Sequence, residues 1–373
     1  MGGKPTRPVD FGFILHPLST EDIFRKLNFM RKWPEPVVKS AVRLLPPLMT
    51  SHITGIESEH GKVEGCFVGV TLTSEQMLEL PPRVTLKKII AAGKKAAETG
   101  AKIVGLGAMT AVVGDAGISV ARNLDVAVTT GNSYTVATAL EGTEKAAEMM
   151  DIDLEQAEVA ILGATGSIGR VCARLLSRKA NYLTLIARDE SRLEALAEEI
   201  LEETGLAVKI TSQVKSSVRA ADIVVAVSSA SESLIEPGDL KPGAVVCDVA
   251  RPRDVSVKVA QQRKDVLIIE GGVVEVPGDV NFNFNFGFPP KTAYACMAET
   301  MILALEKRYE NYSLGRELQL ERVEEIDALA KKHGFELAGF RSFERPVTAE
   351  TIESIKQKAR QANKSYEAAL SKA

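Results

Sequence analysis

The sequence predicts an α/β protein in which a central Rossmann-type parallel sheet domain is flanked by an N-terminal α/β substrate domain and a C-terminal helical region. Two observations lead to this prediction. Between residues 151 and 288, short apolar runs alternate with helical segments, as in a doubly wound sheet. The glycine motif GATGSIG lies between an apolar run and a helical one. We therefore expect domains over residues 1–150, 151–288 and 289–373.

Composition excludes several classes of protein. The chain has 373 residues, of which 45% are hydrophobic and 25% charged, and its net charge is -3. A protein with this slightly negative net charge lacks the positive field that non-specific binding of nucleic acid requires, so no nucleic-acid partner is expected. No apolar run approaches the roughly 18 residues of a membrane-spanning helix, and no signal-peptide core follows the first residues. We expect a cytoplasmic protein without a transmembrane segment.

The first 150 residues read as an irregular α/β region. FGFIL and CFVGVTL are short strand-like runs, and a long surface loop is expected around SEHGK. Residues 86–99 have helical periodicity, and AKIVGLGAMTAVV and LDVAVTT look like buried strands. The segment SYTVATALEGTEKAAEMM is predicted to be helical, with a domain boundary near residue 151.

Predicted strands and helices alternate regularly after residue 151. We predict six strands, at EVAIL, YLTLIA, AVKIT, ADIVVAVS, AVVCDVA and VLIIEGG, with helices at RVCARLLSRK and SRLEALAEEILEE. A short helix is also expected after AVKIT, and this regular alternation predicts a parallel, doubly wound sheet. After residue 289, helices are predicted over 292–309, over 320–333 and from residue 349 onward.

The glycine motif predicts dinucleotide binding. Its first glycine permits a tight turn, and the N-terminal end of the following helix presents N–H groups to a pyrophosphate. Arg188 follows the second strand, where NAD enzymes usually carry an acid, and Arg192 lies one turn later, so NADP(H) is the favoured cofactor. The alternative is that Arg188 is simply solvated. The predicted cofactor-binding set is Gly163, Ala164, Thr165, Gly166, Ser167, Ile168, Gly169, Arg188, Arg192, Gly271 and Gly272.

The four cysteines and four histidines show neither zinc-site spacing nor a disulfide framework, so no metal is expected. Cys66, Cys172 and Cys247 lie in apolar runs and read as core residues. Cys296 is different, because ACMAET opens the predicted C-terminal domain directly after the nucleotide domain. From the residues alone, a buried core cysteine remains the alternative.

A set of motifs occurs in fixed order along the chain. They are FGFILHPLS, GLGAMTAVV, TTGNSYT, VAILGATGSIG, EGGVVE, ACMAETMILALE, NYSLGR and KHGFELA. In this order they resemble the cyanobacterial long-chain acyl-[acyl-carrier-protein] reductases, and the resemblance covers about residues 11–340. The resemblance implies NADPH-dependent reduction of a fatty acyl thioester to a fatty aldehyde through a cysteine thioester, with Cys296 as the nucleophile.

The chain departs from that family at three places. It carries Tyr134 where cyanobacterial members have histidine, its region around residues 45–60 is longer, and its last 30 or so residues extend beyond the usual end. The substrate carrier, acyl carrier protein or coenzyme A, therefore stays open, as do chain length, oligomeric state and the role of the C-terminal extension.

The predicted catalytic residues are Cys296, Ser133 and Tyr134. A helix start after PPK would stabilise the Cys296 thiolate, and Lys291 would add positive charge unless it is solvated. TTGNSYT lies at a strand-to-helix junction, where N–H groups and the Ser133 or Thr135 hydroxyls would stabilise an oxyanion, unless Asn132 or Ser133 merely caps the helix. His16 and Tyr134 are the candidate general acids.

Two further patterns have competing interpretations. Phe282, Phe284, Phe286 and Phe288 recur at every second position, which predicts an edge strand or the wall of an acyl channel. Two groups of basic residues are either solvated faces or a docking site for acidic acyl carrier protein. They are Arg25, Lys26, Arg31 and Lys32, and Arg83, Lys87, Lys88, Lys94 and Lys95.

Two alternative functions stay open. A shikimate-dehydrogenase-like or amino-acid dehydrogenase would share the two-lobed layout but would transfer hydride to a ketone or imine without a covalent step. A non-catalytic NADP-binding sensor would bind the dinucleotide without oxidising it.

Overall fold

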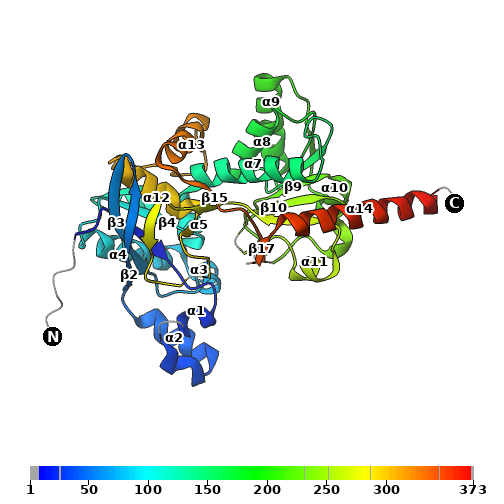
Figure 1. The fold of residues 1–373 in the computed structure, drawn as a ribbon. Coiled ribbons are helices and arrows are strands. Elements are labelled where there is room, and N and C mark those ends of the chain that lie inside the picture. Colours follow the sequence, from blue (N-terminus) through cyan, green and yellow to red (C-terminus); the bar gives the residue numbers. More distant parts are fainter. Residues whose placement is uncertain are drawn as a thin grey trace. The chain divides into compact units, whose positions relative to one another are not determined.

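The structure is a computed structural model that describes residues 8–24, 27–230, 232–250, 252–285, 287–343 and 345–370. It confirms the α/β class, and the chain forms two compact units (Figure 1). Unit 1 comprises residues 1–134 and 274–336, and unit 2 comprises residues 135–273 and 337–373. This division differs from the predicted one, because no separate C-terminal helical domain exists among the described residues.

Unit 1 is built on a six-stranded sheet of order β13-β2-β3-β1-β4-β5. The central strand β1 pairs in parallel with β3 and β4, and β5 pairs in parallel with β4. The strands β2 and β13 continue the sheet in antiparallel fashion. The bounds are β1 Phe11–Leu15, β2 Leu48–Ser58, β3 Gly61–Gly69, β4 Ile103–Leu106, β5 Ala127–Thr129 and β13 Gly278–Asn281.

Two predictions for this region are wrong. SEHGK is not a long loop, because Ser58 pairs with Gly61 in a tight hairpin between two long strands. The run Met109–Val113 is not a strand but lies in a helix, α5 Met109–Ala116. A short apolar run has no periodicity that separates a buried strand from a buried helix, which explains the second error.

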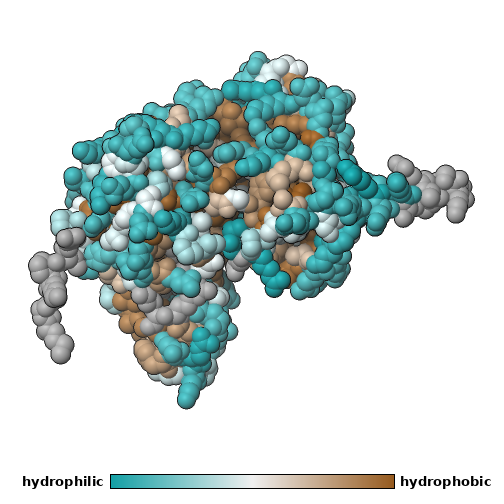
Figure 2. All heavy atoms as spheres, in the orientation of Figure 1, coloured by the Kyte–Doolittle hydropathy of each residue, from teal (hydrophilic) through white to brown (hydrophobic). Residues whose placement is uncertain are grey.

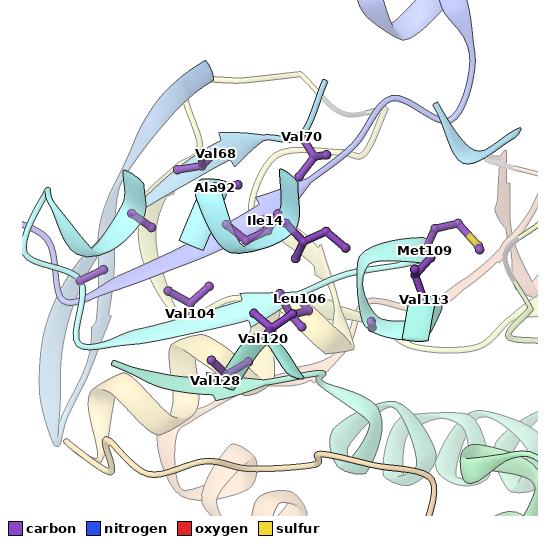
Figure 3. Packing of buried hydrophobic residues seen from close by; sticks show 14 of the residues in the cluster. Ile14, Val68, Val70, Ala92, Val104, Leu106, Met109, Val113, Val120 and Val128 are labelled. Atoms are coloured by element: carbon purple, nitrogen blue, oxygen red, sulfur yellow. The ribbon is translucent and has the colours of Figure 1, made fainter. Parts of the chain in front are cut away.

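Helices cover both faces of this sheet. On one face, α4 packs over Ile14, Val68 and Val104 in a core cluster that also includes α3, α5 and α6 (Figure 3). On the other face, α12 packs against β4, where a Cβ on Gly105 would lie 2.1 Å from the Thr300 hydroxyl. The helix bounds are α3 Ser74–Glu79, α4 Pro82–Ala97, α6 Ile118–Ala121, α12 Ala295–Leu305 and α13 Leu320–His333.

The position of α12 explains the error in the domain division. Nearly every residue of ACMAETMILAL is buried, so the helix is apolar on all sides and needs cover all round. The sheet of unit 1 supplies part of this cover, and α13 packs against the same helix. The helix therefore belongs to the core of unit 1, although its first residue, Ala295, follows the end of β4 at Leu106 by 189 residues in the sequence.

A small helical lobe extends from unit 1 before β2 (Figure 1). It contains α1 Thr20–Phe24, the 3₁₀ helix η1 Asn28–Lys32 and α2 Glu35–Leu44. We call residues 18–48 the N-terminal lobe. Its own core comprises Ile23, Phe24, Met30, Val38 and Val42. Lys88 of α4 fixes its end, because its ammonium group donates to the Leu45 carbonyl at 2.9 Å and to the Thr71 hydroxyl at 2.8 Å.

Unit 2 contains the predicted doubly wound sheet. Its order is β11-β10-β9-β6-β7-β8, and every pairing is parallel. The chain reverses direction across the sheet between β6 and β9, which is where such sheets bind ligands. The strands are β6 Glu158–Leu162, β7 Tyr182–Ile186, β8 Lys209–Thr211, β9 Ile223–Ala226, β10 Val245–Asp248 and β11 Leu267–Glu270.

The remaining elements are connectors and covers. The helices are α7 Asn132–Met149, α8 Ser167–Leu176, α9 Glu190–Thr204, α10 Val214–Ala220, η2 Pro237–Asp239, α11 Val257–Gln262 and α14 Ala349–Leu370. The short strands are β12 Val273–Glu275, β14 Thr292–Tyr294, β15 Glu336–Leu337, β16 Phe340–Ser342 and β17 Arg345–Val347. Among the described residues, no helix has the length and apolar character needed to cross a bilayer.

Candidate functional site

Cys296 is set apart from the other three cysteines by its exposure. Cys66, Cys172 and Cys247 are buried, whereas Cys296 is partly exposed. Burial raises the pKa values of the Cys66 and Cys172 thiols, which keeps them protonated and unreactive. Cys296 is the second residue of α12, whose N-cap, Tyr294, makes no side-chain capping bond. The N-terminal end of a helix favours negative charge, so this position suits a thiolate.

The loop between β5 and α7 lies directly on Cys296. Gly131 has a φ of +76°, and a Cβ built on it would lie 2.2 Å from the Cys296 Cα and 2.3 Å from its Cβ. Only glycine permits both this conformation and this approach. The structure therefore brings TTGNSYT and Cys296 together, although the two segments are far apart in the sequence.

Glu299 connects the same two segments from inside the core. Its carboxylate accepts hydrogen bonds from the Thr129 hydroxyl and, at 2.8 Å, from the Tyr134 backbone N–H. The side chain is fully buried, and this burial raises the pKa of Glu299 although the hydrogen bonds act in the opposite direction. Sequence analysis missed this residue. Its signal was an acid within an otherwise apolar helix, where an unpaired carboxylate is rarely tolerated.

Ser313 fastens the loop from a third segment. Its hydroxyl donates to the Ser133 hydroxyl at 2.7 Å and accepts from the Ser133 N–H at 3.2 Å. The neighbouring Tyr312 N–H donates to the Val128 carbonyl at 3.0 Å, which continues the edge of the sheet beside β5. The motif NYSLGR thus lies against TTGNSYT.

These bonds define what Ser133 and Tyr134 do in this conformation. Both side chains are buried, and the two backbone N–H groups donate to Ser313 and Glu299. The Gly131 N–H donates to the Thr129 hydroxyl at 3.3 Å. The loop is thus held in place by its own donors, and a direct part of Ser133 or Tyr134 in the chemistry stays a prediction.

His16 is engaged at both ring nitrogens. Nδ1 lies 3.1 Å from the Pro17 carbonyl, and Nε2 accepts from the Met109 N–H at 3.1 Å. Burial lowers the pKa of His16, so the ring is neutral and carries its proton on Nδ1. This arrangement suits a structural link between the ends of β1 and β4, and it leaves no proton on Nε2 to give.

Two other expectations have clear outcomes. Lys291 pairs with the exposed Asp279 at 3.4 Å, as its solvated alternative predicts. Residues 282–285, 287 and 288 are not in a strand, although Phe282 stacks on Phe67 with ring centroids 6.0 Å apart. Phe286 lies outside the described residues. The aromatic residues that precede α12 therefore pack, in part, on the sheet of unit 1.

The glycine loop of unit 2 has the geometry that a pyrophosphate cradle needs. Gly163 has a φ of +88°, and a Cβ on it would lie 2.8 Å from the Ser228 Cα. A Cβ on Gly169 would lie 2.3 Å from the Gly163 carbonyl oxygen. Gly166 is the N-cap of α8 and supplies no capping side chain. The backbone at the helix start is therefore open to an anion, with glycine required at two of the three positions.

The loop after β9 is held close to this cradle by a buried acid that the sequence did not reveal. Asp254 accepts from the Ser228 N–H at 2.8 Å and from its hydroxyl. Burial raises the pKa of Asp254. Ser228 thereby stays against Gly163 at the switch point of the sheet.

The two predicted arginines lie beside the glycine loop and at the end of β7. Arg192 donates to the Thr165 carbonyl at 2.9 Å, and Arg188 is exposed. Asp189 faces the start of α9 and caps it, accepting from the Ser191 hydroxyl at 2.8 Å and the Arg192 N–H at 3.2 Å. These bonds lower the pKa of Asp189. Asp189, which follows Arg188 directly, is thus engaged in capping, which favours the NADP interpretation of the arginines.

Gly271 and Gly272 lie at the end of β11. A Cβ on Gly271 would lie 2.7 Å from Val249 and 2.9 Å from the Cys247 sulfur, so packing alone requires glycine there. Gly272 has a φ of +83°. A contact of either residue with the cofactor stays a prediction. No cluster of three or more potential metal ligands occurs in the described part of the chain.

Comparison with known proteins places the chain among oxidoreductases. Residues 144–270 match the family model of shikimate / quinate 5-dehydrogenase. The long-chain acyl-[acyl-carrier-protein] reductase of Synechococcus elongatus is 30% identical over 312 residues, which cover 78% of this chain and 87% of that protein. The chain belongs to the same protein family as this reductase. These relatives support an NAD(P)-dependent oxidoreductase.

Another relative is longer. The aminotransferase PigE of a Serratia species is 32% identical over 360 residues, covering 93% of this chain, but the chain spans only 42% of the length of PigE. Among solved structures, L-tryptophan dehydrogenase from Nostoc punctiforme is 13% identical with a TM-score of 0.41, covering 96% of this chain and 90% of that one. Quinate dehydrogenase from Corynebacterium glutamicum is 14% identical with a TM-score of 0.37, covering 86% and 99%.

We expect the variant Glu299→Gln to gain stability relative to the unchanged protein as pH rises. The raised pKa means that the folded state binds this proton more tightly than the unfolded state. The carboxyl therefore costs stability increasingly as pH rises from the unfolded pKa to the folded one. Glutamine keeps the shape and has no charge to bury. Urea unfolding at a series of pH values measures the difference.

Glu306, at the end of the same helix, provides a matched control. Although partial burial acts to raise the pKa of Glu306, hydrogen bonds from Lys332 and His333 hold it below its usual value. Glu306→Gln should therefore lose stability at neutral pH, with a smaller loss at acid pH. Parallel pH profiles for both variants would contradict the proposed state of Glu299.

Proposed function

We propose that the protein is an NADPH-dependent reductase that converts a fatty acyl thioester, carried by acyl carrier protein or coenzyme A, into a fatty aldehyde. The observation that carries this proposal is the position of Cys296. It is the one partly exposed thiol of the four, it lies at the start of a buried helix, and the backbone of Gly131 packs on it. The relationship to the Synechococcus elongatus reductase supports an acyl-carrier substrate.

The covalent step uses the Cys296 sulfur. Its thiolate would attack the carbonyl carbon of the acyl thioester, and a new carbon–sulfur bond forms while the bond to the carrier sulfur breaks. The carrier leaves as a thiol, taking up the proton that Cys296 lost. The first turn of α12 favours the thiolate, and the network of Thr129, Glu299 and Ser313 keeps the Gly131 loop against it.

The residues of unit 2 fit a nicotinamide dinucleotide phosphate. Gly163 and Gly169 leave no room for a Cβ, so the backbone can approach a pyrophosphate closely, and Arg188 and Arg192 suit a 2′-phosphate. NADPH, when bound, would supply the hydride that reduces the thioester carbon, so that the acyl group leaves as an aldehyde and the Cys296 sulfur leaves as a thiolate, ready for the next acyl group.

The match to shikimate / quinate dehydrogenases supports a second candidate. It covers residues 144–270, which hold the nucleotide fold and not Cys296. A dehydrogenase that transfers hydride directly to a ketone or imine would use the same unit 2. The two candidates differ in whether Cys296 is needed.

The proposal includes docking of an acidic acyl carrier protein, but it uses fewer basic residues than the sequence suggested. Lys87 and Lys94 of α4 are exposed, as expected for a steering surface. Lys88 points inward to Leu45 and Thr71 and is structural. Arg25 and Lys26 lie outside the described residues.

We expect Cys296→Ala to abolish aldehyde formation without weakening NADPH binding. The thiol is the proposed nucleophile, whereas the cofactor would be held by the glycine loop of unit 2. The measurement is mass spectrometry of products after incubation with NADPH and a long-chain acyl thioester on either carrier. Cys172→Ala is the control, because its buried thiol should affect stability and not chemistry.

The outcomes separate the candidates. Aldehyde made by Cys296→Ala at a near-normal rate would move the assignment to the direct dehydrogenase. NADPH binding by the unchanged protein without oxidation of NADPH by any acyl thioester, ketone or imine would favour a sensor.

We expect Arg188→Ala to weaken NADPH binding about ten-fold or more while sparing NADH, because a charge-assisted bond to the 2′-phosphate contributes roughly 1.5 to 3 kcal/mol. Calorimetric titration of both cofactors measures this. Arg219→Ala, which removes an exposed arginine of the same unit, is the control. Equal affinity of the unchanged protein for NADPH and NADH would refute the assignment.

A further inference from the structure

The N-terminal lobe exposes an unusual amount of apolar surface. Of the twelve large hydrophobic residues that are exposed in the described part of the chain, six lie within residues 18–48. They are Leu18, Phe29, Trp33, Val37, Leu44 and Leu48. Leu44 is 85% exposed and Phe29 66%. The lobe shows hydrophobic surface in Figure 2. Exposed apolar side chains gathered in one small lobe indicate an interaction site.

The helix α2 has two apolar stripes. Val38 and Val42 face the core of the lobe and are buried. Val37 and Leu44, seven residues apart and therefore on one side of the helix, are exposed. Val38 and Val42 contribute this helix to the core of the lobe, and the exposed side with Val37 and Leu44 is available to a partner.

Phe29 and Trp33 form an aromatic pair in the segment that directly precedes α2. Their rings meet edge to face with centroids 6.1 Å apart, one at each end of η1. Trp33 is the only tryptophan of the chain and is 42% exposed. Aromatic side chains of this kind are enriched at the interface between lipid acyl chains and headgroups.

The charge of the lobe has the opposite sign to that of the whole chain. Residues 18–48 contain six Lys or Arg and three Asp or Glu, whereas the net charge of the protein is -3. Arg31, Lys32 and Arg43 are exposed; the first two lie between Phe29 and Trp33 in the sequence, and Arg43 lies in the last turn of α2. An apolar surface with a basic rim complements an anionic lipid surface, where acyl chains accept the apolar groups and headgroups attract the cations.

We propose that the N-terminal lobe binds the surface of an anionic phospholipid bilayer, with Phe29, Trp33 and Leu44 inserted at the acyl–headgroup boundary. The apolar surface, more than the charge, distinguishes this partner from an acidic protein. Electrostatic contact with acyl carrier protein would involve the basic residues but would not account for the exposed side chains of Leu44 and Val37. The proposal does not depend on the reaction assigned above, although a fatty aldehyde product would partition into such a bilayer.

The fluorescence of Trp33 tests this proposal on the unchanged full chain. We expect its emission to shift to shorter wavelength when vesicles of phosphatidylcholine and phosphatidylglycerol are added, and brominated acyl chains in the same vesicles should quench it. Vesicles of phosphatidylcholine alone should bind at least about ten-fold more weakly, because the basic rim then has no anionic surface to attract it.

Two paired variants identify the surface. Phe29→Ser with Leu44→Ser should weaken vesicle binding at least about ten-fold, since two large apolar groups no longer insert. Leu201→Ser with Val257→Ser, which removes two exposed apolar residues of unit 2, should leave vesicle binding unchanged. Circular dichroism confirms that each variant is folded.

Three results would overturn the proposal. The first is a Trp33 emission that neither vesicle type changes. The second is equal loss of vesicle binding in both paired variants. The third is a Trp33 shift with acidic acyl carrier protein and none with vesicles, which would assign the surface to a protein partner.

Discussion

The buried carboxyl of Glu299 is the interaction on which the candidate site depends. It joins the end of β5, through the Thr129 hydroxyl, and the start of α7, through the Tyr134 N–H, to the helix that carries Cys296. Burying such a group costs free energy unless hydrogen bonds satisfy it, so this site tolerates little movement between the two segments. Gly131 then brings the loop backbone against Cys296, where any Cβ would clash. The backbone around the Cys296 thiol is thus held by the buried Glu299 carboxyl and by the close approach that Gly131, without a Cβ, permits.

Unit 2 has the same arrangement of a buried acid and a glycine around its glycine loop. Asp254 is buried and holds Ser228 against Gly163, where a Cβ would again clash. In each unit, an acid within the core fixes a loop at the end of a parallel strand, and a glycine permits the close approach. Ser133 and Tyr134, predicted to take part in the chemistry, contribute hydrogen bonds to this framework in unit 1.

Sequence patterns predicted what is local and missed what is distant. The strands of unit 2 and the glycine loop were predictable, because each apolar run and each turn carries its own signal. Glu299 and Thr129 are 170 residues apart, and the sequence around either residue does not indicate that the other is its partner. The place of α12 on the sheet of unit 1 was missed for the same reason, although its mostly apolar composition required burial. The position of Cys296 after the nucleotide domain set it apart from the other cysteines, but its role as nucleophile came from the family resemblance.

The central claim is that Cys296 forms a covalent thioester with the acyl group. The most direct test is the intact mass of the protein after incubation with a long-chain acyl thioester in the absence of NADPH, followed by peptide mapping. The account predicts a mass increase equal to one acyl group, located on Cys296, removed by hydroxylamine and released as aldehyde when NADPH is added. An unmodified protein that nevertheless produces aldehyde once NADPH is present would contradict it.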